Sequence, residues 1–239
     1  YIPIDSYQTA GLPDLVLNRT RSPKVSRWYE ERQIPVYHPS ELVEIANDKY
    51  KTLCYIGQNL PQSLQTWCPV SQRIEAREQE NLTRPDPEQW VIKSLQGHGG
   101  SEVFLLSDAR WRERLAGQAL LLQRRIPSKS QDLRIYLLGG TVYQAVLRTG
   151  TKDFRSNYSL GGSVEAYSLS ESQWQRVQLI LKALPEEWKG MLGMDFILTE
   201  QGELVFNELE EMVGCRMLYQ CTAKDIVKDY VKLLVQGLS

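Results

Sequence analysis

One stretch of the chain gathers charged residues and glycines that could bind an anion. Asp132 and Arg134 stand two positions apart in a β-branched and aromatic run, so a strand would turn both side chains to one face. Gly139-Gly140 predicts a hairpin turn, and the returning strand ends in Arg148. The residues that follow are a polar loop with Arg155, Ser156 and Asn157, and then Gly161 and Gly162. Arginines and glycines at the ends of one hairpin favour a polyphosphate ligand, and the alternative is a solvated hairpin with charged ends.

A glycine-rich turn, Gln96 to Gly100, lies between two predicted strands, Trp90–Lys93 and Val103–Leu106. Such a turn lets backbone N–H groups approach an anion closely, and Lys93 directly before it adds a positive charge. It is not a Walker A loop, because no GxxxxGK[ST] run occurs and no helix follows directly. The sequence therefore predicts a second phosphate-binding element, with an ordinary glycine hairpin and a surface lysine as the alternative.

A third group consists of carboxylates on a hairpin near the C-terminal end. Asp195 lies on its first strand, and the second strand runs from apolar residues into the polar run Asn207–Glu211. Clustered carboxylates repel one another unless a cation lies among them, and oxygen ligands without a nearby Cys or His favour Mg2+. The alternative is a solvated acidic loop after a strand.

The predicted elements that position these groups begin with a βαβα alternation. A buried strand is expected at Asp14–Asn18 and another strand at Ile34–Tyr37, with helices that start at Pro23 and Pro39. This alternation predicts a parallel sheet. The charged segment Arg73–Pro87 is expected to be a linker or an exposed helix.

Two amphipathic helices are predicted in the C-terminal half. One runs from Ser170 to Leu184 with Ser170 as its N-cap, and the other runs from Asp225 to Leu234. Their inward residues are expected from helical spacing. They are Trp174, Val177, Leu181 and Leu184 in the first helix and Ile226, Val227, Tyr230 and Leu234 in the second.

Composition argues against several classes of protein. The 239 residues carry a formal net charge of -1, so no overall basic field would attract nucleic acid. No apolar run approaches the ~20 residues that span a bilayer. The first residues lack the basic and apolar regions of a signal peptide. Four scattered cysteines and two histidines make a zinc site unexpected and favour a reduced, cytoplasmic setting.

The order of these pieces resembles the ATP-grasp superfamily, and within it the RimK-like ligases. The matching elements are a lysine before a glycine loop, a D-x-R hairpin, the run Asp153–Asn157 with a glycine pair, and a G-x-D hairpin with carboxylates. Asn47-Asp48-Lys49 with Thr52 is similar to the D-K-x-x-T element of the family. The resemblance covers roughly Asp14 to the C-terminus. It implies an α/β (α+β) ATP-grasp fold, in which two α+β subdomains clasp ATP after a truncated parallel α/β domain.

The resemblance also implies a domain organisation. Residues 1–70 would form a partial domain that precedes the ATP-grasp domain, together with a connecting helix. Residues 71–239 would form the ATP-grasp domain, with 71–128 as a lid-type subdomain that carries the glycine loop and 129–239 as a C-terminal subdomain that carries the magnesium site.

Roles of single residues follow from the same resemblance. Lys49 and Lys93 would hold the ATP phosphates, Asp132 would contact the ribose, and Arg148 would act near the transferred phosphate. The expected nucleotide-binding residues are Lys49, Lys93, Gly97, Gly99, Gly100, Gln123, Arg124, Arg125, Asp132 and Ser156. The expected catalytic residues are Arg148, Arg155 and Asn157. The substrate carboxylate or peptide end is expected to meet Arg19, Arg21, Gly161, Gly162 and Arg216, because loops after strands hold ligands in α/β sheets.

The E-x-N pattern of the family on the last strand is altered in this chain. Regular pairing with Asp195 would turn Asn207 inward and bury Leu209, which cannot bind a metal, beside the phosphates. A one-residue bulge would instead turn Glu208 and Glu210 inward and leave Asn207 as a neutral ligand or hydrogen-bond donor. The bulge is preferred, so the expected metal ligands are Asp195, Glu208, Glu210 and Asn207. Strand alternation would aim Glu211 away, and its removal should matter far less.

These features predict an ADP-forming ligase that joins a carboxylate to an amine through an acyl phosphate, with ATP and Mg2+. The expected substrates are an amino acid and a carboxylate-bearing peptide or small molecule. No nucleic-acid or membrane partner is expected, and a homo-oligomer is compatible with the sequence. One alternative is an ATP-binding module that has lost ligation and serves regulation or assembly. Another is a peptide-modifying ligase that closes amide or ester links between side chains.

Overall fold

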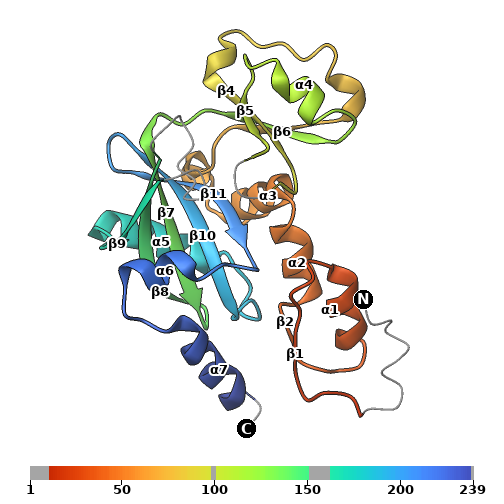
Figure 1. The fold of residues 1–239 in the computed structure, drawn as a ribbon, viewed down its shortest axis with the longest axis vertical. Coiled ribbons are helices and arrows are strands. Elements are labelled where there is room, and N and C mark those ends of the chain that lie inside the picture. Colours follow the sequence, from red (N-terminus) through yellow and green to blue (C-terminus); the bar gives the residue numbers. More distant parts are fainter. Residues whose placement is uncertain (1–10, 98–100, 151–161, 238–239) are drawn as a thin grey trace.

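The computed structural model describes residues 11–97, 101–150 and 162–237. The strands of this part of the chain form three β-sheets. A four-stranded sheet lies at the top of Figure 1, a five-stranded sheet lies at the lower left, and a two-stranded sheet lies at the lower right. The helix α3 (Lys49–Asn59) runs between these parts in Figure 1.

The N-terminal sheet consists of two short parallel strands. β1 (Val16–Leu17) pairs with β2 (Val36–Tyr37) across α1 (Pro23–Glu30), and α2 (Ser40–Ala46) follows. The expected parallel pairing is therefore confirmed. The expectation of a buried first strand is wrong, because Leu17 is 45% exposed on a sheet of only two strands.

His38 fastens this N-terminal part to the five-stranded sheet. The imidazole is buried against Gly190, where an added Cβ would lie 2.1 Å from Cε1 of His38, so only glycine leaves it room. Burial lowers the pKa of His38 to about 4. Its neutral form therefore stabilises the folded protein, and this contribution is present above the ordinary pKa of 6.5 and is lost as the pH falls toward 4.

We expect the free energy of unfolding to fall by on the order of 2 kcal/mol between pH 7 and pH 5 because of His38 alone. Denaturant titration of the protein and of His38→Gln at both pH values measures this contribution as the difference in pH dependence between the two proteins. Equal pH dependence in both would show that His38 titrates normally in the folded state.

The four-stranded sheet has its own small core. Its strand order is β3 (Ser71–Ile74), β6 (Leu120–Arg124), β4 (Trp90–Ser94) and β5 (Val103–Leu105), all antiparallel. The helix α4 (Arg110–Arg114) covers one face with Trp111, which is fully buried and donates its indole N–H to the carbonyl of Leu106.

The charged segment Arg73–Pro87 belongs to this unit, so its interpretation as a linker or exposed helix is wrong. It contains the end of β3, which is an edge strand, and a 3-10 turn at Ala76–Glu78. The guanidinium of Arg112 donates to the carbonyls of Gln79 and Leu82 at 2.6 and 3.3 Å. Buried Ile74 and Leu82 pack the segment into the core of this unit. Two apolar residues among many charged ones do not form a periodic pattern from which a strand or helix could be predicted.

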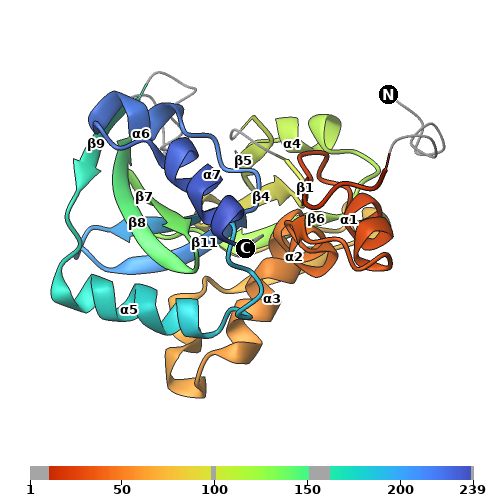
Figure 2. The ribbon, with the colours of Figure 1, turned by 90° about the horizontal axis from the view of Figure 1, so that it is seen from below.

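The five-stranded sheet is antiparallel throughout and holds the largest core. Its strand order is β11 (Leu204–Glu210), β10 (Met191–Thr199), β7 (Ser128–Leu138), β8 (Thr141–Thr149) and β9 (Ser163–Tyr167). Figure 2 shows α5 (Glu171–Lys182) and α3 on one face and α6 (Arg216–Cys221) and α7 (Ile226–Gln236) on the other.

Strand alternation divides β7 between the two faces. Leu133, Ile135 and Leu137 pack into the core beneath α5 and α3. Asp132, Arg134 and Tyr136 point to the face of α6 and α7, where Tyr136 joins a second apolar cluster. The charged pair therefore lies on a face that helices cover only in part.

Two expected inward residues point outward instead. Trp174 is 40% exposed, because Gln173 takes the inward place expected of it, whereas Val177 is buried as predicted. The amide of Gln173 donates to the carbonyl of Gly202 at 2.8 Å, which explains why a polar residue takes the inward place. In α7, the buried residues Ile226, Tyr230 and Leu234 follow one stripe, which leaves Val227 45% exposed.

Candidate active site

A network of buried charges lies on the face of β7, β8 and β10. Asp195 is 1% exposed and accepts two hydrogen bonds from Arg134, from Nε at 2.8 Å and from Nη2 at 2.6 Å. Arg148 donates to the same carboxylate at 2.7 Å and also forms an ion pair with Asp132. Strand pairing places Asp195 opposite Arg134, and Asp132 opposite Arg148. Cross-strand register therefore builds this network.

The two arginines keep Asp195 ionised. Burial acts to raise the pKa of Asp195, but Arg134 and Arg148 outweigh it and hold the pKa at about 2. The pKa of Arg148 lies above its ordinary value, because Asp132 and Asp195 outweigh the effect of burial. A buried ion network of this kind is stable only while each charge keeps its partners.

Three carboxylates meet where β10 and β11 lie side by side. One oxygen atom each from Asp195, Glu208 and Glu210 lies within 4.8 Å of the others. Burial, with a further contribution from Asp195 and Glu208, raises the pKa of Glu210 to about 7, although Arg134 lies 2.9 Å away and opposes the shift. Close carboxylate oxygens without sulfur or imidazole suit a hard cation such as Mg2+.

A β-bulge on β11 creates this arrangement, as the sequence predicted. Asp195 pairs with Glu208, whereas the next residue, Phe196, pairs with Phe206, so Asn207 is the extra residue. Phe206 and Leu209 both pack in the core, which leaves Glu208 and Glu210 on the opposite side. Leu209 therefore stays away from the charged site, and the bulge prediction is confirmed. Whether these carboxylates bind a metal stays a prediction.

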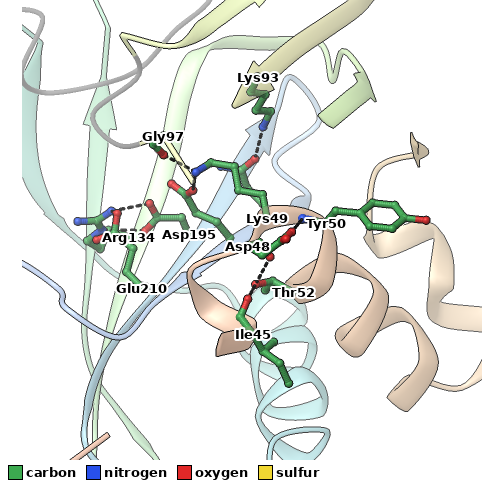
Figure 3. A network of polar contacts seen from close by, with 12 residues as sticks. Ile45, Asp48, Lys49, Tyr50, Thr52, Lys93, Gly97, Arg134, Asp195 and Glu210 are labelled. Atoms are coloured by element: carbon green, nitrogen blue, oxygen red, sulfur yellow. Dashed lines mark hydrogen bonds and ion pairs between the residues drawn. The ribbon is translucent and has the colours of Figure 1, made fainter. Parts of the chain in front are cut away.

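Two lysines from distant parts of the chain face the carboxylates (Figure 3). Lys93, at the end of β4, donates to Oδ1 of Asn207 at 3.1 Å. Burial lowers the pKa of Lys93 to about 8. Nζ of Lys49 lies 3.3 Å from Glu208 and also donates to the carbonyl of Gly97. The lysines thus lie between the glycine loop and the acidic strand.

Local capping places Lys49 at the first turn of α3. The carboxylate of Asp48 accepts from the backbone N–H groups of Tyr50 and Lys51 at 2.9 and 3.0 Å, as an N-cap does. The hydroxyl of Thr52 donates back to the carbonyl of Ile45 at 2.7 Å. Figure 3 shows this turn with Lys49 extended from it toward the charged site.

Two of the expected nucleotide-binding residues, Gln123 and Arg124, lie at the end of β6. Gln123 is 2% exposed and donates to Ser71 Oγ, whereas Arg124 is exposed and binds Gln89. Gly162 packs so closely that an added Cβ would lie 2.4 Å from the carbonyl oxygen of Thr149. The predictions for Gly99, Gly100, Arg155, Ser156, Asn157 and Gly161 lie outside the described residues.

The three arginines predicted for substrate binding lie in different surroundings. Arg21 lines a small hollow together with Lys49, Glu208 and Glu210, so it stands at the charged site. Arg19 lies close enough to His38 and Cys215 to act on both electrostatically: it adds to the effect of burial, which lowers the pKa of His38, and it opposes the effect of burial, which raises the pKa of Cys215. Arg216 begins α6, directly after Cys215.

The sequence assigned no site role to Asn47 or Glu211, and it indicated Arg134 only as one charge of a possible anion site. Strand alternation predicts that Arg134 shares a face with Asp132. In the structure Arg134 also pairs opposite Asp195. Glu211 is not one of the three clustered carboxylates, but it is only 4% exposed and accepts a hydrogen bond from Asn47. No sequence pattern indicates a contact between residues so far apart.

Solved structures of other proteins share this fold. The ATP-grasp ligase PsnB, solved with minimal precursor, Mg and ADP, superposes with a TM-score of 0.64 at 18% identity over 91% of this chain and 66% of that one. The chain therefore has the fold of ATP-grasp ligases, which confirms the expected fold class, and in this fold two lysines face three carboxylates.

The chain belongs to the RimK-like ATP-grasp family, whose domain model matches residues 47–234. It is 26% identical over 229 residues to the uncharacterized protein MG011 of Mycoplasma genitalium, covering 93% of this chain and 74% of the relative. It is 30% identical over 158 residues to human N-acetylaspartylglutamate synthase A, covering 61% of this chain and 39% of the synthase. The expectation of an ADP-forming RimK-like ligase with ATP and Mg2+ as cofactors agrees with these relatives.

Proposed function

We propose that this chain joins a substrate carboxylate to an amine at the expense of ATP, through the site built by β4, β7, β8, β10 and β11. The observation that supports this most is the position of Lys49 and Lys93 opposite Asp195, Glu208 and Glu210. Lysines suit the phosphates, and carboxylates suit the cations that accompany them. The same surface therefore offers both kinds of contact that a nucleotide–metal complex requires.

The proposed reaction has two steps. The carboxylate oxygen of one substrate attacks the γ-phosphorus of ATP, the bond to ADP breaks, and an acyl phosphate forms. The amine of the second substrate then attacks the acyl carbon, releases phosphate and loses a proton to water. No protein nucleophile is required, so the chain contributes positioning and charge.

We assign a role in this reaction to the three carboxylates and to two arginines beside them. Asp195, Glu208 and Glu210 would hold Mg2+, which when bound would offset the negative charge of the phosphates. Arg148 would stabilise the transferred phosphoryl group from its position beside Asp195. Arg134 would orient Asp195 and Glu210, since it contacts both carboxylates.

Lys93→Ala is expected to weaken nucleotide binding by roughly 1–3 kcal/mol, the scale of one charge-assisted contact. Calorimetric titration with ADP and Mg2+ measures this loss, and Lys129→Ala, an exposed lysine on β7, is the matched control. An unchanged affinity in Lys93→Ala would remove this residue from the site.

The substrate class is proposed from the relatives and from Arg21. One relative is named as a synthase of N-acetylaspartylglutamate, and another is an ATP-grasp ligase solved with a precursor peptide. We therefore propose an amino acid together with a small acid or peptide. Arg21, at the hollow beside Glu208 and Glu210, would bind the carboxylate of one of them.

Arg21→Ala is expected to raise the KM for the carboxylate substrate by roughly tenfold, which corresponds to about 1.4 kcal/mol, with little change in the KM for ATP. Steady-state ADP release measures both constants. Lys24→Ala, which removes an exposed cation nearby, should leave both unchanged. Equal KM values for Arg21→Ala and the unaltered protein would exclude this role.

The subdomain boundaries, the cellular setting and the oligomeric state are also proposals. We propose the division of the chain at residue 71, with 71–128 as lid-type subdomain and 129–239 as C-terminal subdomain. A cytoplasmic setting and a homo-oligomer stay predictions. Within the described residues, no helix has the length and apolar character required to cross a membrane.

A further inference from the structure

A hydrogen bond between Asn47 and Glu211 joins two segments that are far apart in the chain. Nδ2 of Asn47 donates to Oε1 of Glu211 at 2.8 Å and to the carbonyl of Val43 at 2.8 Å. Glu211 is only 4% exposed. A buried carboxylate is costly unless it accepts hydrogen bonds, so this contact determines where Glu211 can lie.

Both partners stand directly beside residues of the proposed nucleotide site. Glu211 follows Glu210, the last residue of β11, and Asn47 lies two residues before Lys49 at the junction of α2 and α3. The backbone N–H of Lys49 donates to the carbonyl of Leu95 at 3.0 Å, at the end of β4. The junction therefore contacts both the acidic strand and the segment that leads into the glycine loop.

Lys49 has a second link to β11, through its ion pair with Glu208 at 3.3 Å. This link competes with the proposed function, because the same carboxylate is proposed to bind Mg2+ and the same ammonium to bind phosphate. When the nucleotide and its metal are bound, Lys49 and Glu208 each take a new partner. The contact between Asn47 and Glu211 involves neither group, so it can persist in both states.

We propose that Asn47 and Glu211 form a positioning pair that holds the α2–α3 junction against the end of β11 and so keeps Lys49 at the phosphates. This inference rests on the proposed role of Lys49. It reverses the expectation that Glu211 matters far less than its neighbours. Glu211 is not one of the three clustered carboxylates, yet it acts on the site through Asn47.

The test exchanges the hydrogen-bond donor and the acceptor between positions 47 and 211. Asn47→Asp sets two carboxylates against each other, whereas Asn47→Asp combined with Glu211→Gln restores an amide donor opposite a carboxylate. We expect Asn47→Asp to weaken the binding of ADP with Mg2+ about tenfold, and the double variant to recover affinity to within about threefold of the unaltered protein. Calorimetry under conditions where each variant is fully folded measures both.

Asn59→Asp is the matched control. Asn59 donates to the carbonyl of Tyr55 at 2.8 Å, the same four-residue contact that Asn47 makes to Val43, but it lies exposed at the far end of α3. Its replacement makes the same chemical change without a carboxylate opposite. We expect its affinity for ADP with Mg2+ to stay within twofold of the unaltered protein.

Coupling to Lys49 separates a positioning role from a purely structural one. If Asn47 acts through Lys49, Asn47→Asp should weaken binding less than twofold when Lys49→Met is already present. Should Asn47→Asp fail to fold, Asn47→Ala, which adds no charge, takes its place in both comparisons.

Three results would overturn the inference. They are an unchanged affinity of folded Asn47→Asp with only a lower unfolding midpoint, no recovery in the double variant, and an equal loss with and without Lys49. If the unaltered protein binds no ADP with Mg2+, the proposed function itself fails and the inference falls with it. That failure is distinguishable, because it appears before any substitution is made.

Discussion

Replacing Glu208 with glutamine is expected to lower the ligation rate by roughly 10³-fold, or about 4 kcal/mol of transition-state stabilisation. The substitution keeps the shape of the side chain and removes one of the three carboxylates whose oxygen atoms meet within 4.8 Å. Mg2+ at this site would lose an anionic ligand at the point where phosphoryl transfer needs it. We expect Asp195→Asn to act in the same direction.

Substrate-dependent ADP release over a series of Mg2+ concentrations measures the loss. Glu200→Gln makes the same change at an exposed position in the turn of the same hairpin and should leave the rate unaltered. A rate for Glu208→Gln within threefold of the unaltered protein would show that Glu208 is not a metal ligand. The next candidate would then be Glu210.

Arg148→Lys is expected to reduce kcat by roughly 10²-fold, with a smaller effect on the KM for ATP. Arg148 contacts Asp132 and Asp195 at the same time, and a lysine, with one compact charged group, cannot reproduce both contacts while it faces the phosphoryl group. The proposed role of Arg148 is confined to the transferred phosphate, so binding of ADP should change little.

Arg148→Met tests how much of this effect is structural. Removal of the guanidinium would break the buried ion pair between Arg148 and Asp132, and breaking a buried pair costs roughly 3–5 kcal/mol. Denaturant unfolding of both variants, compared with their kcat values, separates stability from catalysis. A kcat for Arg148→Lys equal to that of the unaltered protein would remove Arg148 from the chemistry.

The hairpins and the bulge could be predicted because each has a local cause. Gly139 and Gly140 both have positive φ, which is the conformation that a tight hairpin turn requires and glycine accepts. The bulge at Asn207 followed from a physical conflict, since a regular strand would have placed Leu209 among charges. The structure resolves this conflict by shifting the register after Asp195, so Leu209 packs with Phe206 in the core.

The contacts that could not be predicted depend on the tertiary arrangement. β3 is a polar edge strand, and its pairing with β6 is decided by the neighbouring strand and not by its own residues. The inward turn of Gln173 in place of Trp174 depends on the carbonyl of Gly202, which is supplied by another hairpin. Likewise, the partner of Asn47 lies 164 positions away, beyond the reach of any local pattern.

The most direct test of the proposed site is a crystal structure with ADP and Mn2+ in place of Mg2+, in which the anomalous signal locates the metal. The account predicts metal–oxygen bonds of roughly 2.1–2.2 Å to Asp195 and Glu208, with Lys49 turned from Glu208 to a phosphate and Asn47 still bonded to Glu211. A metal bound through Asn207, with Glu208 facing solvent, would contradict it.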